Sequence, residues 1–304
     1  MNIQQLLTFV TLVEYKTLKE VSNQLHIRQP TVYFHLKNLE EKYPFALFKS
    51  GHSKTTELTK EGRVLYHQAK QIISLLDKTS LMMEDFAEKR MGSLSIGSTY
   101  TPATYMILPT ISRFKTAYPN ANLSVEVKPA NVLIDKLKNF EIDLAIFSYN
   151  EFNDAEMHAD KLIKEDLQLL LHPDHKLAGK QTITASDLNN QPFILHEKGS
   201  LTRSFVDNWL NEYQLKVNEV MELSSTETMK EAVKNQLGIA IVSISCAMEE
   251  QKNGKLAGRP IPNFEVNRYI YVGYHKRQVL TDTMESFLNM LKEDFESIRK
   301  TRVN

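Results

Sequence analysis

The stretch that decides the fold of the N-terminal part is residues 17–39, TLKEVSNQLHIRQPTVYFHLKNL. Thr17 with Glu20 three residues later is the pattern of a helix N-terminus, and Pro30 suits the first turn of a further helix. The residues before this stretch predict another helix, because apolar side chains recur at i, i+3, i+4 and i+7. They are Leu6, Phe9, Val10 and Val13. Two short helices, a three-residue turn and a third helix predict a helix-turn-helix, whose last helix normally enters the major groove of DNA.

The outward face of the expected third helix carries side chains of the kinds that contact DNA. A glutamine pairs with adenine, and the apolar edges of tyrosine and phenylalanine meet thymine methyl groups. Arginine and lysine bind phosphates and so position the protein. The alternative is an ordinary solvated surface helix, which two adjacent exposed aromatic residues disfavour. The candidate DNA-binding residues are Arg28, Gln29, Pro30, Thr31, Tyr33, Phe34 and Lys37.

Two short strands are expected next, at residues 45–48 and 57–58, with a basic tip between them. The tip follows a helix-turn-helix, so it is interpreted as a wing that reaches the DNA backbone or the minor groove. His52 and Lys54 are its candidate contacts. The alternative is an ordinary hairpin loop.

The order of these motifs resembles the winged helix-turn-helix of the LysR-type transcriptional regulators over residues 1 to about 90. The most specific pieces are Leu25-His26-Ile27-x-Gln29-Pro30-x-Val32 and Leu58-Thr59-x-x-Gly62. The resemblance implies DNA contacts by Gln29, Pro30, Tyr33, Phe34 and Lys37. Where the family usually has serine, this chain has Arg28 and Tyr33, so no single base contact is carried over.

Residues 59–89 predict one long helix with an apolar repeat of alternating four- and three-residue spacing. This repeat is typical of a two-stranded coiled coil, although a helix packed on its own domain is the alternative. In the resembling family this helix is the dimerisation linker, which implies a homodimer or homotetramer. The expected seam residues are Leu65, Ala69, Ile72, Leu76, Met83 and Phe86, with Thr79 between them.

In residues 90–304 strand and helix patterns alternate, which predicts an α/β domain with parallel sheets covered by helices. Two such units joined by two crossovers resemble the periplasmic-binding-protein-like effector domain of the same family. We therefore expect a winged helix-turn-helix domain at 1–58, a linker helix at 59–89 and an effector domain at 90–304. Its first lobe would take about 90–162 and 268–304, and its second lobe about 163–267.

A small ligand in such a domain lies beyond the carboxyl ends of the strands, near helix N-termini. Hydroxyl and amide side chains stand at several of these places and suit a small anion. Each Ser or Thr could instead be a simple helix cap. The turn at 98–101 is also similar to the Thr-rich turn of sulfate-responsive regulators of cysteine biosynthesis, although an organic carboxylate fits as well. The candidate effector residues are Ser98, Thr99, Tyr100, Thr101, Asn131, Ser148, Ser200, Thr202, Ser225 and Thr226.

The net charge of zero, from 37 basic and 37 acidic residues in 304, conceals an asymmetry. Residues 1–70 carry ten Lys or Arg against six Asp or Glu, a net of +4, so the remainder carries −4. A basic head on an acidic body suits a DNA-reading module. The single cysteine, and the absence of a signal-peptide pattern and of a long apolar run, favour a cytoplasmic protein without membrane contact.

Enzyme function is disfavoured, because the sequence has no phosphate-binding glycine loop, no metal-ligand spacing and no G-x-S-x-G motif. The run His172-Pro173-Asp174-His175 is interpreted as a polar turn, and Cys246 as a buried packing residue. The sequence thus predicts a regulator that binds double-stranded DNA and a small, anionic effector, with RNA polymerase as a partner if it activates. No cofactor and no metal are expected. The alternatives are a switch at Cys246, action without an effector, and a solute-binding protein.

Overall fold

The computed structural model describes residues 1–49, 57–87 and 92–303. The chain forms two compact units. One unit comprises Met1–Ser93 with Asp135–Asp143, and the other comprises Leu94–Ile134 with Leu144–Asn304. No helix in the described ranges combines the length and the apolar character needed to cross a membrane.

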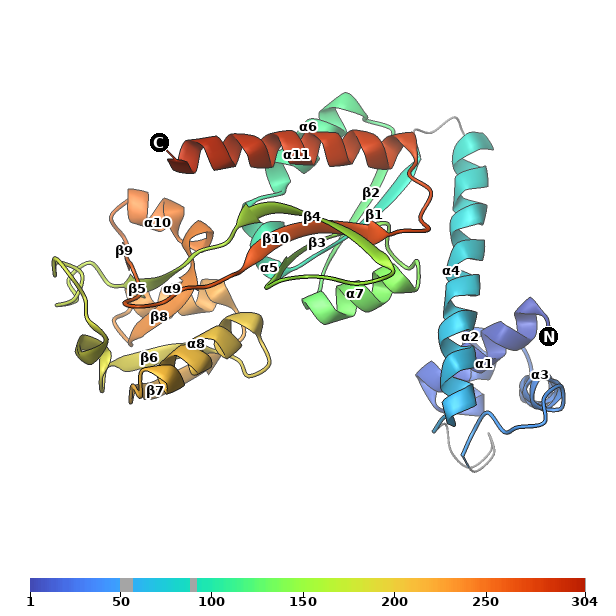
Figure 1. Ribbon diagram of the computed structural model, residues 1–304. Coiled ribbons are helices and arrows are strands. Elements are labelled where there is room, and N and C mark those ends of the chain that lie inside the picture. Colours follow the sequence, from blue (N-terminus) through green and yellow to red (C-terminus); the bar gives the residue numbers. More distant parts are fainter. Residues whose placement is uncertain (50–56, 88–91, 304) are drawn as a thin grey trace. The chain divides into compact units, whose positions relative to one another are not determined.

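The first unit contains the predicted helix-turn-helix, built from α1 (Ile3–Tyr15), α2 (Leu18–Gln24) and α3 (Gln29–Glu40) (Figure 1). The Thr17 hydroxyl accepts a hydrogen bond from the backbone N–H of Glu20, so α2 begins where the sequence predicts. The inward residues of the three helices pack into one core, in which Phe9 and Leu39 are fully buried. The helix-turn-helix is therefore confirmed.

The two strands expected around the wing are reduced to a single antiparallel bridge between Phe48 and Leu58. Leu47 and Phe48 are both buried in the core of the first unit. The Lys49 N–H donates to the Glu57 carbonyl and the Thr59 N–H to the Leu47 carbonyl beside the bridge. The described pairing comprises one residue on each side, which is too short for two strands. His52 and Lys54 lie outside the described residues.

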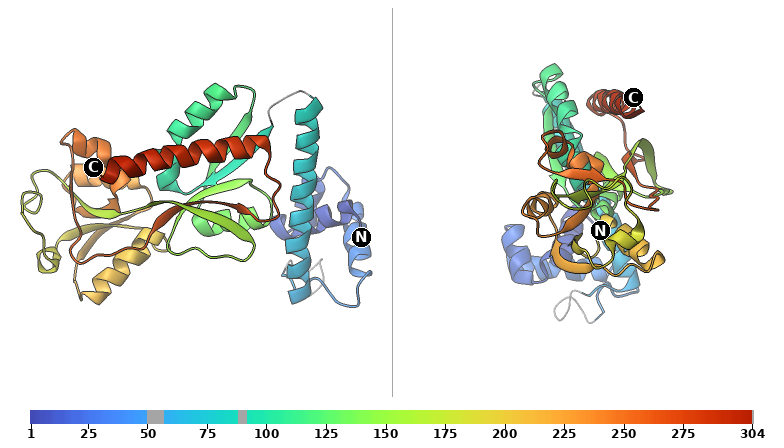
Figure 2. Two further views of the ribbon diagram at one scale, coloured as in Figure 1. Left: turned by 45° about the horizontal axis from the view of Figure 1, so that its top comes forward. Right: turned by 90° about the vertical axis from the view of Figure 1, so that its left-hand side faces the viewer.

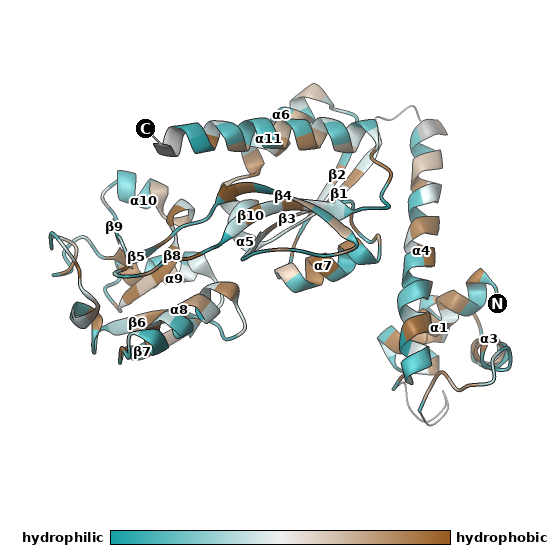
Figure 3. Cartoon of the chain, viewed as in Figure 1, coloured by the Kyte–Doolittle hydropathy of each residue, from teal (hydrophilic) through white to brown (hydrophobic). Residues whose placement is uncertain are grey.

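Helix α4 (Lys60–Ala87) follows as one long helix, as expected. Its first turn lies against the preceding segment so closely that a Cβ atom at Gly62 would stand 2.1 Å from the Leu47 carbonyl oxygen. Hydrophobic segments recur along α4 between hydrophilic ones (Figure 3). Ala69, however, is fully buried in the core formed with α1–α3, and Leu65 packs against that core. The expectation that Ala69 contributes to a seam with another helix is therefore wrong.

The second unit contains two five-stranded sheets (Figure 2). The first has the order β2-β1-β3-β10-β4. Its strands are β1 (Ser93–Ser98), β2 (Asn122–Val127), β3 (Leu144–Tyr149), β4 (Met157–Lys164) and β10 (Tyr269–His275). The helices of this part of the chain are α5 (Tyr100–Tyr105), α6 (Leu108–Ala117), α7 (Ala130–Lys138) and α11 (Asp282–Val303).

The second sheet has the order β7-β6-β8-β5-β9. Its strands are β5 (Leu167–Leu171), β6 (Pro192–His196), β7 (Asn218–Leu223), β8 (Ile239–Ser243) and β9 (Ala257–Arg259). The helices between them are η1 (Ala185–Leu188), α8 (Leu201–Glu212), α9 (Thr226–Lys234), η2 (Ile244–Cys246) and α10 (Met248–Lys252). The chain passes from the first sheet to the second after β4 and returns before β10.

Both sheets are mixed, whereas the sequence predicted parallel ones. Strand β1 pairs parallel with β3, but β10 runs antiparallel to β3 and β4. In the second sheet β6 is parallel to β7 and β8, and β5 is antiparallel to β8 and β9. The strands that run opposite to their neighbours are β5 and β10. Each of them is the first strand after the chain has passed from one sheet to the other. Alternation of strand and helix does not reveal the direction in which a strand enters its sheet.

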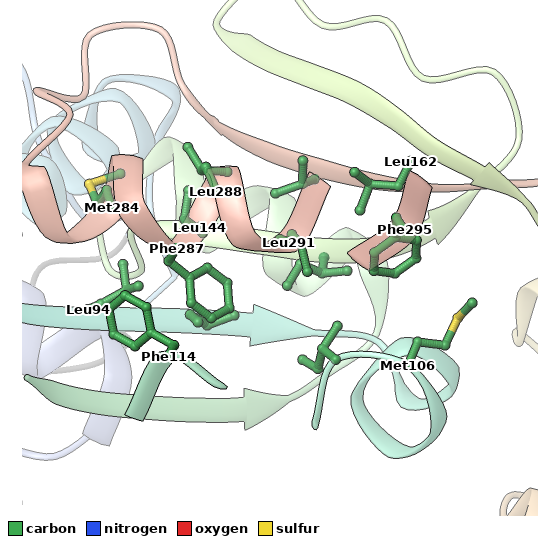
Figure 4. Packing of buried hydrophobic residues seen from close by; sticks show 14 of the residues in the cluster. Leu94, Met106, Phe114, Leu144, Leu162, Met284, Phe287, Leu288, Leu291 and Phe295 are labelled. Carbon is green, nitrogen blue, oxygen red and sulfur yellow. The ribbon is translucent and has the colours of Figure 1, made fainter. Parts of the chain in front are cut away.

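Helices α6 and α11 pack together over one face of the first sheet. Figure 4 shows Phe114 of α6 close to Phe287 of α11, in the same cluster as Leu94 and Leu144 of the sheet. The Phe114 and Phe287 rings meet edge to face, with centroids 5.4 Å apart. Burial of each such ring stabilises the fold by about 1.5–3 kcal/mol and so contributes to holding α6 and α11 on the sheet.

Candidate functional site

A cavity of about 660 Å³ lies between the two sheets of the second unit. Its wall is formed by residues at or just after the carboxyl ends of β1, β2, β3, β6, β7 and β8, and by the first turns of α5, α7, α8 and α9. Both the volume and the place are typical of small-molecule sites in α/β proteins.

Most of the predicted effector residues line this cavity, although they come from distant parts of the sequence. They are Thr99, Tyr100, Thr101, Asn131, Ser148, Ser200, Thr202 and Thr226. Ser98 and Ser225 are not among the lining residues. Ser98 is fully buried and donates to the Ile146 carbonyl, and Ser225 accepts from the Thr228 N–H as the cap of α9. For these two serines the simpler structural role applies.

On the side of the first sheet, Thr99 and Ser148 are held together. The Thr99 hydroxyl accepts a hydrogen bond from the Ser148 backbone N–H at 3.0 Å. The Ser148 hydroxyl itself is buried and has no partner among the described residues, and the same holds for Ser243 across the cavity. A buried hydroxyl without a partner costs about 1–3 kcal/mol. These two hydroxyls therefore offer unused hydrogen-bonding capacity at the cavity wall.

On the side of the second sheet, the first turn of α8 lines the cavity. Ser200 caps this helix by accepting from the Arg203 N–H, and Thr202 accepts from Nη1 of Arg268 at 2.8 Å. A helix N-terminus carries a partial positive charge and favours a nearby anion. This part of the wall thus combines hydroxyl groups with positive potential.

Arg268 is the main wall residue that the sequence analysis missed. It is buried, it donates from Nε to Glu165 at 2.7 Å, and its place directly before β10 made it part of an expected strand. Its position at a strand junction was the available signal. The contact with Glu165, 103 positions away, is visible only in the tertiary structure. Lys128, His196 and Lys198 also line the cavity and were not predicted.

The charges along the wall favour an anion. Among the described residues that line the cavity, Lys128, Lys198 and Arg268 are cationic and Glu197 is the acidic one. Burial, together with the charge of Arg268, lowers the pKa of His196 to about 4, so that this imidazole is neutral at pH 7. The cavity therefore carries a net positive charge without any contribution from the histidine.

Cys246 also lines the cavity, with Sγ 3.8 Å from Oγ1 of Thr101. Burial raises the pKa of its thiol to about 12. Since the thiolate is the reactive form, a thiol with this pKa is a poor nucleophile at neutral pH. In the described ranges, no group of three or more His, Cys, Asp or Glu side chains is arranged to hold a metal ion.

The predicted DNA-binding face of α3 is exposed. Tyr33 is 46% exposed and Phe34 59% exposed, whereas Val32, Leu36 and Leu39 of the same helix are buried. Arg28, Gln29, Pro30 and Lys37 are exposed, and Thr31 is half-buried. Two large aromatic side chains on one solvent-facing surface are unusual, because such side chains are normally buried at least in part.

The predicted seam residues of α4 differ in their exposure. Ile72, Leu76 and Met83 are exposed at 42%, 40% and 62%, with Leu75 and Met82 beside them. The side chain of Phe86 lies outside the described residues. The part of α4 beyond Ala69 therefore carries several exposed apolar side chains, although Ile73 still packs against the core of the first unit.

Comparison with known proteins places both parts of the chain in one family. The family description "LysR substrate binding domain" matches residues 87–296, and "Bacterial regulatory helix-turn-helix protein, lysR family" matches residues 3–63. The HTH-type transcriptional regulator CysL of Bacillus subtilis (strain 168) is 27% identical over 290 residues, which is 95% of this chain and 96% of CysL.

Solved structures that are similar to the chain include the following two. The regulatory domain of CcmR from Synechocystis PCC6803, in complex with 2-PG, is 27% identical with a TM-score of 0.59. The match covers 66% of this chain and 96% of that domain. The crystal structure of CbnR covers 97% of this chain and 99% of its own, with a TM-score of 0.67. At 18% identity, the likeness to CbnR concerns the fold.

Proposed function

Because this chain belongs to the LysR family of transcriptional regulators, we propose that two or more copies read paired DNA sites under the control of a small anion. In this proposal residues 1–58 contact the DNA, residues 59–89 join two copies, and residues 90–304 bind the anion between their lobes. The complex of the CcmR regulatory domain with 2-PG supports an effector in this part of the chain.

The DNA-binding part of the proposal is supported by the exposed face of α3. Gln29, Tyr33 and Phe34 can reach base edges, while Arg28 and Lys37 suit the phosphates. A few base contacts give one copy of the domain only modest affinity for DNA. Two joined copies bind a paired site more tightly, because the second copy binds at a high effective concentration once the first is bound. The exposed apolar surface of α4 beyond Ala69 supports such pairing.

The observation that carries the effector proposal is the cavity wall, which combines hydroxyl groups with an excess of positive charge. The volume of about 660 Å³ corresponds to roughly 20 water molecules at about 30 Å³ each, so a single inorganic anion leaves much of it unfilled. We therefore favour an organic anion, a carboxylate or a phosphate ester, over sulfate.

Thermal unfolding of the full chain with a panel of inorganic anions, short carboxylates and phosphorylated acids tests the effector proposal. A ligand at 100 times its Kd stabilises the native state by about 2.7 kcal/mol. Ser148→Ala removes a buried hydroxyl that has no partner among the described residues, so we expect the stability without ligand to be equal to that of the wild type or higher. The affinity of the variant for the stabilising anion should fall about 2- to 10-fold.

The matched control is Ser225→Ala, which removes the cap of α9 outside the cavity wall. We expect it to lower stability by about 1 kcal/mol while leaving the ligand-induced shift intact. If the anion stabilises Ser148→Ala as strongly as the wild type, the effector lies elsewhere.

A further inference from the structure

The two chain segments that connect the sheets are tied together at Glu165 and Arg268. Glu165 follows β4 and Arg268 precedes β10, so each residue stands where the chain passes between the lobes. The Glu165 N–H donates to the Arg268 carbonyl at 2.8 Å, and Arg268 Nε donates to the Glu165 carboxylate at 2.7 Å. Both side chains are buried, with exposed fractions of 1% for Glu165 and 5% for Arg268.

This ion pair leaves unused groups on both partners. An arginine and a carboxylate often form two parallel hydrogen bonds, but Arg268 uses one N–H on Glu165 and one on Thr202. The Nη2 group of Arg268 makes no hydrogen bond within the described residues, and Arg268 lines the cavity. The second carboxylate oxygen of Glu165 is buried without a partner. The guanidinium therefore keeps donors for a further acceptor.

Arg268 also differs from the other cations of the wall. Lys128 and Lys198 are exposed, so water screens their charge, whereas the buried guanidinium acts in surroundings of lower dielectric constant. Among the described residues of the wall, it is the buried cation. A carboxylate or phosphate oxygen of a ligand would therefore have its strongest electrostatic attraction at Arg268.

We infer that Arg268 selects the charge of the effector and does so from the hinge between the lobes. The inference rests on the proposed effector function of the cavity and names the group that makes the ligand an anion. Because the same guanidinium holds Glu165 at the hinge and Thr202 at the start of α8, an anion bound to Nη2 acts on both contacts. Glu165 lowers the positive potential that the anion meets, and thereby limits its affinity.

Calorimetric titration of the full chain with phosphate, succinate and uncharged succinamide tests this inference. Arg268→Gln alone would leave Glu165 as a buried unpaired charge, so the test uses the double variant Glu165→Gln/Arg268→Gln. We expect the double variant to unfold cooperatively and to bind the two anions about 10- to 100-fold more weakly, as for loss of a charged hydrogen bond. Any binding of succinamide should change less than about 3-fold.

Two further variants separate charge selection from a structural role. Glu165→Gln alone leaves the buried guanidinium without its ion partner, so we expect lower stability without ligand. Because it keeps Arg268 and removes the competing negative charge, anion affinity should rise about 3- to 10-fold. Lys164→Gln removes an exposed positive charge next to Glu165 but outside the cavity wall, and should leave anion affinity within about 2-fold of the wild type.

Wild-type anion affinity in the double variant would overturn the inference, and so would an equal loss of anions and succinamide. A loss in Lys164→Gln as large as in the double variant would also overturn it. If no anion of the thermal panel binds the wild type, the effector proposal itself fails. If anions bind the wild type and Ser148→Ala weakens them while the double variant does not, only the role of Arg268 is refuted.

Discussion

At the scale of single residues, His196 connects the cavity to the stability of the protein. It ends β6 at the cavity wall, where burial and the charge of Arg268 lower its pKa from 6.5 to about 4. As the pH falls, this histidine is protonated in the unfolded state before it is protonated in the folded state, because its pKa is lower in the folded state. The contribution of the neutral His196 to the unfolding free energy is therefore fully present above about pH 6.5 and is lost as the pH falls from there towards 4.

We predict that His196→Gln removes this pH dependence. At pH 5 the wild type should have lost about 2 kcal/mol of unfolding free energy relative to pH 7 that the variant retains. Urea unfolding of both proteins at the two pH values measures the difference. An equal loss in both proteins would mean that other groups cause the acid sensitivity.

At the scale of elements, α3 divides its surface between core and solvent. Leu36 and Leu39 anchor the helix, and Tyr33 with Phe34 remains exposed on the other side. The two sets carry different roles, because the buried side chains hold the helix and the exposed ones face the solvent, where base edges can be met. Changes to the exposed set should therefore affect recognition more than folding.

We predict that Phe34→Ala weakens binding to the preferred DNA sequence by about 1–3 kcal/mol, roughly 5- to 150-fold, with little loss on random DNA. Fluorescence anisotropy at fixed salt measures both, after the preferred site has been selected from a random duplex library. Arg28→Ala is the control, since loss of a phosphate contact should weaken binding to both DNAs alike. Equal losses for Phe34→Ala on both DNAs would contradict a role in readout.

At the scale of the whole molecule, the charge asymmetry and the apolar surface of α4 point to an assembly. A net charge of +4 on residues 1–70 is modest for a protein that binds DNA, so two copies acting together would contribute much of the affinity. The surface available for this pairing is the part of α4 with Ile72, Leu76 and Met83.

We predict that Leu76→Asp converts the assembly to monomers or weakly associated chains, because it places a charge in an apolar contact. Affinity for a paired site should fall about 100-fold or more, towards that for a single half-site. Light scattering after gel filtration and anisotropy measure the two effects. Leu76→Met keeps the volume and the apolar character, and should retain both properties. A Leu76→Asp protein that keeps the wild-type mass would place the interface elsewhere.

The sequence by itself determined the local elements of this protein and their order. Periodicity, capping residues and Pro30 act within a few positions, so the helices around residues 17–39 and the long α4 could be predicted. The wall residues Thr99, Ser200 and Thr226 could also be predicted, because a ligand site at strand ends follows from the α/β pattern.

Only the tertiary structure decided which of these elements contact one another and with which face. The same apolar repeat places Ala69 in the core of its own unit and leaves Leu76 exposed, because periodicity does not identify the surface that a helix covers. Both sheets are mixed because strand direction depends on the two passages of the chain between the lobes. Arg268 is held at the cavity wall by hydrogen bonds to Glu165 and Thr202, which are 103 and 66 positions away in the sequence. Contacts across such distances leave no local pattern in a sequence, because they depend on how whole elements pack.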